Sequence, residues 1–292
     1  MADPTGGALP VHRDHSRSFA DNLYVYPVVS RRSRGVSLGV NLNPDKLCNF
    51  DCVYCQVDRT VPPAVRTVDE TRLLAELDAL LDLVVTGDLF EHERFRDTPP
   101  ALRRLNDIAF SGDGEPTSYP RFLEVVRAVT ELRDRRGLTG VKLVLITNAT
   151  LFHRPRVRDA LAEIDRAGGE IWAKLEAGTE AYYHAIERTT VPFRRVLDNI
   201  TDAARVRPLV IQAMFPRLHD QPPSPEECAA FCDRLNNILH AGGRLRLVQV
   251  YTVARAPAES FVTPLSRDEV DALAALVRDR TGLPVEAFYG PD

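Results

Sequence analysis

Three cysteines lie close together in the run Cys48-Asn49-Phe50-Asp51-Cys52-Val53-Tyr54-Cys55. This CxxxCxxC spacing would let three thiolates on one tight loop hold three irons of a cubane iron–sulfur cluster. Such clusters usually have four cysteine ligands. No fourth Cys or His stands near this loop, because His15 and His92 are far away in the sequence. One iron would then lack a protein ligand, and an open iron is a place where chemistry can occur.

Two less reactive uses of these cysteines are weighed against the cluster. A structural zinc site needs four Cys or His ligands, so zinc would have to recruit a ligand from elsewhere. A disulfide framework does not fit five cysteines in 292 residues without a secretory signal. We therefore favour the open-site cluster, and zinc or structural thiols stay as the alternatives.

The overall composition excludes some classes of partner. The formal net charge is −4, which gives no general attraction to nucleic acid or to anionic membranes. No apolar run approaches the roughly 18 residues of a membrane span. The first residues lack the apolar core of a signal peptide. We expect a cytoplasmic protein with no membrane partner, in which the thiolates stay reduced.

Short apolar strands alternate with amphipathic helices along the chain. Strands are expected at 37–42, 107–111, 142–147, 170–175, 209–215 and 245–250. Helices are expected at 68–84, 121–136, from Pro155 to just before Gly168, at 194–206, at 225–240 and from Ser266 onward. Capping boxes are predicted for the first helix (Thr67 with Glu70) and the last (Ser266 with Glu269).

Strict alternation of strand and helix indicates an α/β fold in which parallel strands are joined by helical crossovers. The residues alone leave open whether the sheet is doubly wound or an incomplete barrel. We expect a loose segment at 1–20 and a single domain over 21–292.

Unusual polar residues follow several of the expected strands. The cysteine run follows the first strand, Asp113-Gly114-Glu115 the second and Asn148 the third, while Lys174 and Glu176 close the fourth. The carboxyl ends of parallel strands meet on one rim, where functional groups of α/β folds gather. This convergence predicts a single active site.

With these motifs the chain resembles the radical S-adenosylmethionine (radical SAM) superfamily. The CxxxCxxC loop after strand one and the Gly-Glu motif after strand two carry the resemblance, which extends over about residues 22–285. More narrowly, Phe110–Thr117 and the surroundings of Lys174 look like the group that includes the wyosine-forming tRNA enzymes. The family's fold implies a partial (β/α)6 TIM-like barrel with parallel strands and outer helices.

The resemblance also implies roles for individual residues. Cys48, Cys52 and Cys55 would ligate a [4Fe–4S] cluster whose open iron is chelated by S-adenosylmethionine. Gly114 and Glu115 match the family's Gly-Gly-Glu stretch, which binds the ammonium of that cosubstrate. Asp113 stands where the family has its first Gly. Asn148 is a candidate for contact with the ribose, and Tyr54 borders the adenine or shields the cluster.

Lys174 is unusual because only three of the 37 Lys and Arg residues are lysines. In a barrel it would direct a compact charge at the cosubstrate's carboxylate. Glu176, two residues further, points to the same side of the strand and would accept hydrogen bonds from the ribose. A simple Lys174–Glu176 ion pair at the rim is the alternative.

The implied reaction is reductive cleavage of S-adenosylmethionine to a 5′-deoxyadenosyl radical that abstracts hydrogen from a substrate. An external one-electron donor such as flavodoxin or ferredoxin is implied with it. We favour a small metabolite or a nucleoside as substrate. Modification of a tRNA base is the alternative reaction, and a non-catalytic iron–sulfur redox or binding protein is the alternative class.

Several further residues are left with two interpretations. Gln212 would contact adenine or substrate, or would be a satisfied core amide. Cys228 and Cys232 are four residues apart on a helix and are expected to be buried structural thiols, since two cysteines cannot hold a cluster.

Overall fold

A computed structural model of the chain describes residues 19–290, apart from 256 and 258. Its main element is one sheet of eight strands in the order β1-β2-β3-β4-β5-β6-β8-β10. Neighbouring strands run parallel except β1 and β2, which are antiparallel. The strands span Val25–Ser30 (β1), Gly35–Val40 (β2), Leu105–Phe110 (β3), Lys142–Thr147 (β4), Glu170–Lys174 (β5), Leu209–Met214 (β6), Leu245–Tyr251 (β8) and Val285–Phe288 (β10).

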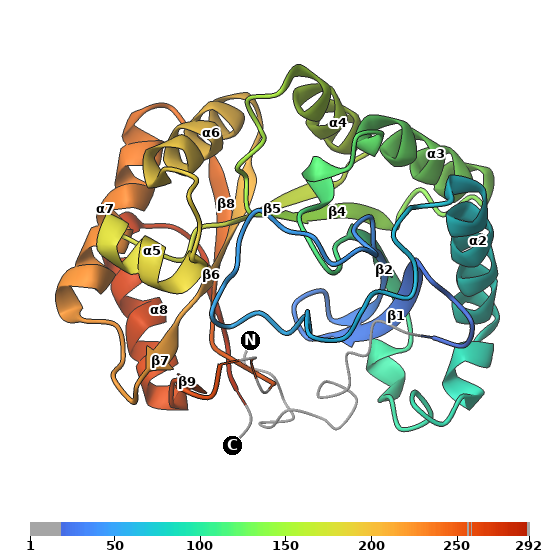
Figure 1. The fold of residues 1–292 in the computed structure, drawn as a ribbon, viewed down its shortest axis with the longest axis horizontal. Coiled ribbons are helices and arrows are strands. Elements are labelled where there is room, and N and C mark those ends of the chain that lie inside the picture. Colours follow the sequence, from blue (N-terminus) through green and yellow to red (C-terminus); the bar gives the residue numbers. More distant parts are fainter. Residues whose placement is uncertain (1–18, 256, 258, 291–292) are drawn as a thin grey trace.

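Helices cover the outer side of the curled sheet (Figure 1). The helices of the described residues are α2 (Glu70–Thr86), α3 (Phe122–Arg135), α4 (Pro155–Arg166), α5 (Glu180–Glu187), α6 (Phe193–Val206), α7 (Pro225–His240) and α8 (Arg267–Thr281), with short 3₁₀ turns at Asp88–Glu91, Pro100–Leu102 and Pro116–Ser118. A second, two-stranded sheet pairs β7 (Pro216–Leu218) with β9 (Val262–Pro264). The fold is thus a partial TIM-like barrel, as predicted.

All six predicted strands are present, as β2, β3, β4, β5, β6 and β8. The two edge strands, β1 and β10, were not predicted. The four residues of β10 are only half-buried, so their sequence lacks the apolar run that marks the central strands.

The two ends of the main sheet are linked by the hairpin that joins β1 to β2. Arg31 donates a hydrogen bond from Nη1 to the carbonyl of Tyr289, at 2.5 Å, just beyond the end of β10. Arg34 forms an ion pair with Glu286 of β10 at 3.3 Å. These side chains therefore connect the two edge strands, which the sheet order places at opposite ends.

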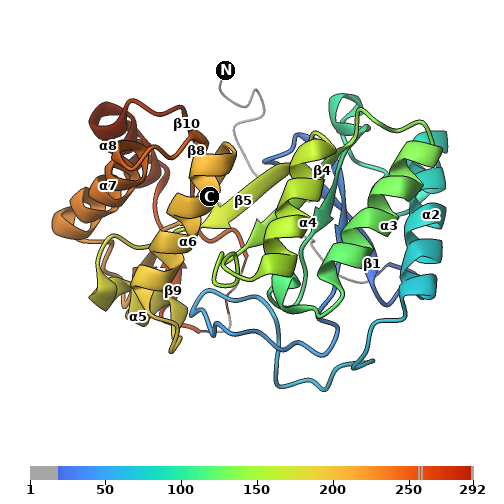
Figure 2. The ribbon, with the colours of Figure 1, turned by 90° about the horizontal axis from the view of Figure 1, so that it is seen from above.

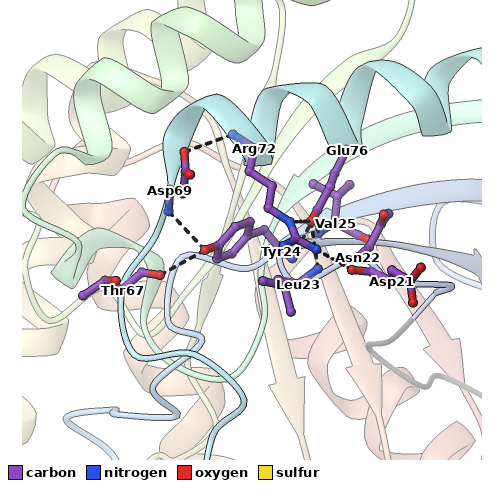
Figure 3. Close-up of polar contacts among 9 residues, drawn as sticks. All are labelled: Asp21, Asn22, Leu23, Tyr24, Val25, Thr67, Asp69, Arg72 and Glu76. Carbon is purple, nitrogen blue, oxygen red and sulfur yellow. Dashed lines mark hydrogen bonds and ion pairs between the residues drawn. The ribbon is translucent and has the colours of Figure 1, made fainter.

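The start of β1 is fastened to α2 by a buried carboxylate (Figure 3). Glu76 accepts hydrogen bonds from the backbone N–H groups of Leu23, Tyr24 and Val25, at 2.9, 2.9 and 3.2 Å. Arg72, one turn earlier, donates to the same carboxylate at 2.9 Å. Glu76 thus satisfies three donors for which the sheet offers no partner.

Replacing Glu76 with Ala should lower the free energy of unfolding by about 3 kcal/mol, because buried N–H groups lose their acceptor. Urea denaturation measures this. Glu131→Ala, at an exposed position of α3, is the control and should change stability by less than about 0.5 kcal/mol. Equal effects of the two substitutions would contradict the assigned role of Glu76.

The predicted capping box at Thr67 and Glu70 is wrong. Asp69 is the N-cap of α2, and its side chain accepts a hydrogen bond from the backbone N–H of Arg72 at 3.1 Å. The carboxylate of Glu70 instead accepts a hydrogen bond from the Tyr119 hydroxyl at 2.8 Å. The capping box at the start of α8 is confirmed.

The expectation of a loose segment at 1–20 falls almost wholly outside the described residues. The assignment of 21–292 to a single domain stays a prediction. Within the described part of the chain, no helix combines the length and the apolar character needed to cross a membrane.

Candidate functional site

The cysteines lie in the long segment between β2 and α2, residues 41–69, which we call the cysteine loop. Figure 2 shows this loop running along one end of the parallel strands. It borders a cavity of about 290 Å³ inside the partial barrel. Most of the predicted site residues line that cavity: Cys48, Cys52, Tyr54, Cys55, Asp113, Gly114, Glu115, Asn148 and Lys174. The structure therefore brings together residues that are far apart in the sequence.

The cysteine loop is held by the end of helix α5, which sequence reasoning missed. The backbone N–H groups of Asp51 and Val53 donate to the carbonyls of Glu187 and Ile186, at 3.1 and 2.9 Å. Thr189 adds a hydrogen bond from its hydroxyl to the carbonyl of Asn49, at 2.8 Å. Helix α5 has eight residues, shorter than the lengths that periodicity detects well. Thr179, its N-cap, was the available signal.

The three thiols have different surroundings. Cys52 donates to the buried carboxyl of Glu187 at 2.7 Å, while Arg59 donates from Nη1 to Cys55 Sγ at 3.2 Å. Burial raises the pKa of Cys48, and burial together with Glu187 raises the pKa of Cys52 well above its usual value. Within the described residues, no three Cys, His, Asp or Glu side chains are grouped closely enough to hold a metal ion. The three thiols share one loop and line one cavity.

The loop after β3 packs tightly against the cysteine loop. A side chain at Gly114 would collide with the carbonyl of Leu47, and one at Gly112 with the side chain of Asn41. Asn41 also donates to the carboxylate of Asp113 at 2.7 Å and accepts from its backbone N–H at 3.1 Å. Only glycine permits such a close approach of two backbones.

Glu115 connects the ends of β3 and β4. Its carboxylate accepts four hydrogen bonds, from the backbone and hydroxyl of Thr117, the hydroxyl of Thr147 and the backbone N–H of Asn148, at 3.1, 2.5, 2.6 and 2.7 Å. Burial raises the pKa of Glu115, and these hydrogen bonds oppose that effect. Glu115 therefore fixes the rim, and its binding of an ammonium group stays a prediction.

Asn148 links β4 to the cysteine loop. Its side-chain amide donates to Asn49 Oδ1 at 2.8 Å, and its own Oδ1 accepts from the Thr150 hydroxyl at 2.7 Å. Asn49 in turn donates to that hydroxyl at 2.7 Å. The predicted contact of Asn148 with a ribose is untested, and the observed contacts position the loop.

Lys174 and Glu176 form the ion pair that the sequence left as an alternative, with Nζ 3.4 Å from Oε1. Lys174 also donates to the hydroxyl of Tyr54 at 3.0 Å, and that hydroxyl donates to Glu176. Tyr251 donates to Glu176 as well, at 3.3 Å. Glu176 is buried and does not line the cavity within the described residues, whereas 24% of the Lys174 side chain is exposed.

Charge is concentrated where this network meets Cys52. Burial raises the pKa of Glu187 well above its usual value, and the nearby carboxylate of Glu176 raises it further. Burial disfavours the charge on Lys174, but Glu176 and other neighbours outweigh it and raise the Lys174 pKa well above its usual value. The Lys174 ammonium is therefore the stable cation of this part of the cavity.

The other cysteines lie away from the cavity, on α7. Cys232 is fully buried in the main core and Cys228 packs against that core. This placement agrees with the expectation of structural thiols.

Comparison with known proteins decides the family. The sequence profile of the radical SAM superfamily matches residues 42–222, which include the three cysteines Cys48, Cys52 and Cys55 and the strands β3 to β6. The chain belongs to the radical SAM superfamily.

Relatives called UPF0026 proteins match about half of this chain. The UPF0026 protein of Helicobacter pylori strain 26695 is 31% identical over 140 residues, covering 48% of this chain and 39% of the relative. The UPF0026 protein of Methanocaldococcus jannaschii is 32% identical over 156 residues, covering 51% of this chain and 42% of the relative. The matched region thus spans about two fifths of the length of these relatives.

Solved structures share the fold at low sequence identity. A radical SAM methyltransferase from Sphaerobacter thermophilus has a TM-score of 0.62 and 12% identity, covering 91% of this chain and 69% of that one. TYW1 with a lysine-pyruvate adduct bound has a TM-score of 0.52 and 16% identity, covering 85% of this chain and 74% of that one. Both place this radical SAM chain among partial barrels and do not define its reaction.

Proposed function

We propose that this chain is a radical SAM enzyme that binds a [4Fe–4S] cluster and S-adenosylmethionine, and that it acts on a small metabolite or a nucleoside. The observation that carries the proposal is the shared cavity, which is lined by three thiols after β2, the acidic loop Asp113–Glu115 after β3 and Lys174 at the end of β5. A non-catalytic iron–sulfur protein would need the thiols alone.

The residues present suit the cluster. Cys48, Cys52 and Cys55 supply three soft thiolate ligands on one loop, and thiolates are the ligands that iron–sulfur clusters prefer. Arg59 donates a hydrogen bond to Cys55 and places a positive charge beside this sulfur. When bound, the cluster supplies the electron that cleaves S-adenosylmethionine reductively.

The other residues would bind and orient the cosubstrate. Lys174 presents an ammonium to the cavity, which suits a carboxylate. Tyr54, within the cysteine loop, is buried at the cavity wall and would help to keep water from the cosubstrate. Asp113 and Glu115 line the same cavity, and their carboxylates would hold an ammonium.

Electron paramagnetic resonance of the anaerobically reconstituted protein tests the proposal. After reduction, S-adenosylmethionine should change the signal of the cluster, because it binds the iron that has no cysteine. A cluster signal that stays the same at millimolar S-adenosylmethionine would support a redox or binding role instead. An electron donor such as flavodoxin or ferredoxin, and a cytoplasmic location, belong to the same proposal.

A wyosine-type reaction on tRNA is the second candidate, favoured by the fold shared with TYW1. Such an enzyme should bind tRNA with an affinity that falls steeply as salt rises, since phosphate contacts release counterions. The net charge of −4 argues against this. We expect no tRNA binding by gel shift at about 50 mM salt. Micromolar, salt-sensitive binding would reverse the order of the two candidates.

A further inference from the structure

Two glutamines face each other inside the barrel. Gln212 of β6 and Gln249 of β8 are partners in the strand register. Gln212 donates from Nε2 to Gln249 Oε1 at 2.9 Å. Their exposed fractions are 0% and 2%. On the other side of Gln212, its register partner is Lys174 of β5, so these three polar side chains form one level across the barrel.

This polar level lies between apolar ones. Two residues earlier on the same strands, Trp172 pairs with Val210 and Val210 with Leu247. Trp172 and Val210 pack in one apolar cluster with Ala109 and Val144. Two residues later, Met214 pairs with Tyr251. Gln212 therefore lies between the apolar level of Trp172, Val210 and Leu247 and the Met214–Tyr251 pair.

Gln212 has a hydrogen-bonding atom without a partner. It lines the cavity, and within the described residues its Oε1 makes no hydrogen bond. The hydrogen bond to Gln249 Oε1 assigns Nε2 of Gln212 as the donor, which leaves the acceptor Oε1 available for a ligand. A buried polar atom without a partner is costly, so a ligand in the cavity that supplies the partner gains that energy.

We propose that Gln212 is a specificity-determining residue that binds a neutral amide-type edge of the substrate, as found in a nucleobase or a carboxamide. Oε1 would accept a hydrogen bond from an N–H of that edge, while Gln249 holds the Gln212 amide in place. A neutral group is expected because the Trp172–Val210 level next to Gln212 is apolar and the Gln212–Gln249 pair carries no charge. This inference rests on the proposed function, since it names a substrate class for that site.

Saturation-transfer NMR on the full chain tests this inference with three probes: uracil, hypoxanthine and nicotinamide. At least one probe should bind, and Gln212→Leu should weaken its affinity at least about tenfold, or about 1.4 kcal/mol. Gln212→Met is the second variant if the Leu variant fails to fold. Met214→Leu, on the same strand and also lining the cavity, should change affinity by less than about twofold.

The three probes distinguish a nucleobase from a carboxamide as the group that Gln212 binds. Binding of uracil or hypoxanthine assigns a nucleobase, and binding of nicotinamide assigns a carboxamide. The inference is overturned if no probe binds, or if both Gln212 variants bind as the parent does. It is also overturned if Gln212→Leu weakens S-adenosylhomocysteine and spares the probes, since Gln212 would then serve the cosubstrate. Probe binding can be measured without a cluster. A failure of the proposed function would instead appear in the iron content and in the electron paramagnetic resonance signal.

Discussion

Cys52→Ala should lose most of its cluster iron, falling from about four irons per chain to less than about one after anaerobic reconstitution. Three thiols are the available ligands on the cysteine loop, and two cannot keep a cubane cluster in place. The loss is measured as iron and acid-labile sulfide per chain and as the visible absorbance of the cluster.

The matched control is Cys228→Ser, which removes a thiol from α7 without touching the cavity. Its iron content should equal that of the parent. Cys52→Ser separates folding from ligation, because a hydroxyl can keep the hydrogen bond to Glu187 but is a poor iron ligand. Full iron in both Cys52 variants would contradict the assignment of this thiol.

Lys174→Met should lower the free energy of unfolding by about 3 kcal/mol, because it leaves the buried Glu176 without its cation. It should also weaken S-adenosylmethionine binding while the iron content stays unchanged. Urea denaturation and equilibrium dialysis measure the two effects.

The double variant Lys174→Met with Glu176→Gln separates the two roles of the lysine. Removing both charges should restore most of the stability, since the single loss comes from an uncompensated buried carboxylate. Binding of S-adenosylmethionine should stay weak. Unchanged affinity in Lys174→Met would mean that Lys174 serves only the ion pair.

The sequence predicted which residues lie at the rim of the site better than it predicted the contacts among them. Asp113, Asn148 and Lys174 could be placed on one rim because polar residues follow apolar strands, and parallel strands end on the same side. Strand β4, Lys142–Thr147, shows the apolar run that made this possible. The partial barrel with parallel strands then followed from the family resemblance.

Other parts of the site depend on contacts between distant segments, which local patterns do not encode. Glu187, on a helix of eight residues, accepts a hydrogen bond from Cys52. The buried Glu176 accepts hydrogen bonds from Tyr54 and Tyr251. The cap at Asp69 was missed because Thr67 and Asp69, two residue types that cap helices, both stand just before α2. In each case, tertiary contacts decided between locally similar choices.

The most direct measurement of the central claim is the formation of 5′-deoxyadenosine, detected by mass spectrometry. The reconstituted protein is incubated with dithionite and S-adenosylmethionine, beside variants with Ala at Cys48, Cys52 or Cys55. The account predicts 5′-deoxyadenosine from the parent and none from the three variants. No product from a parent chain that carries about four irons, or zinc in place of iron, would contradict it.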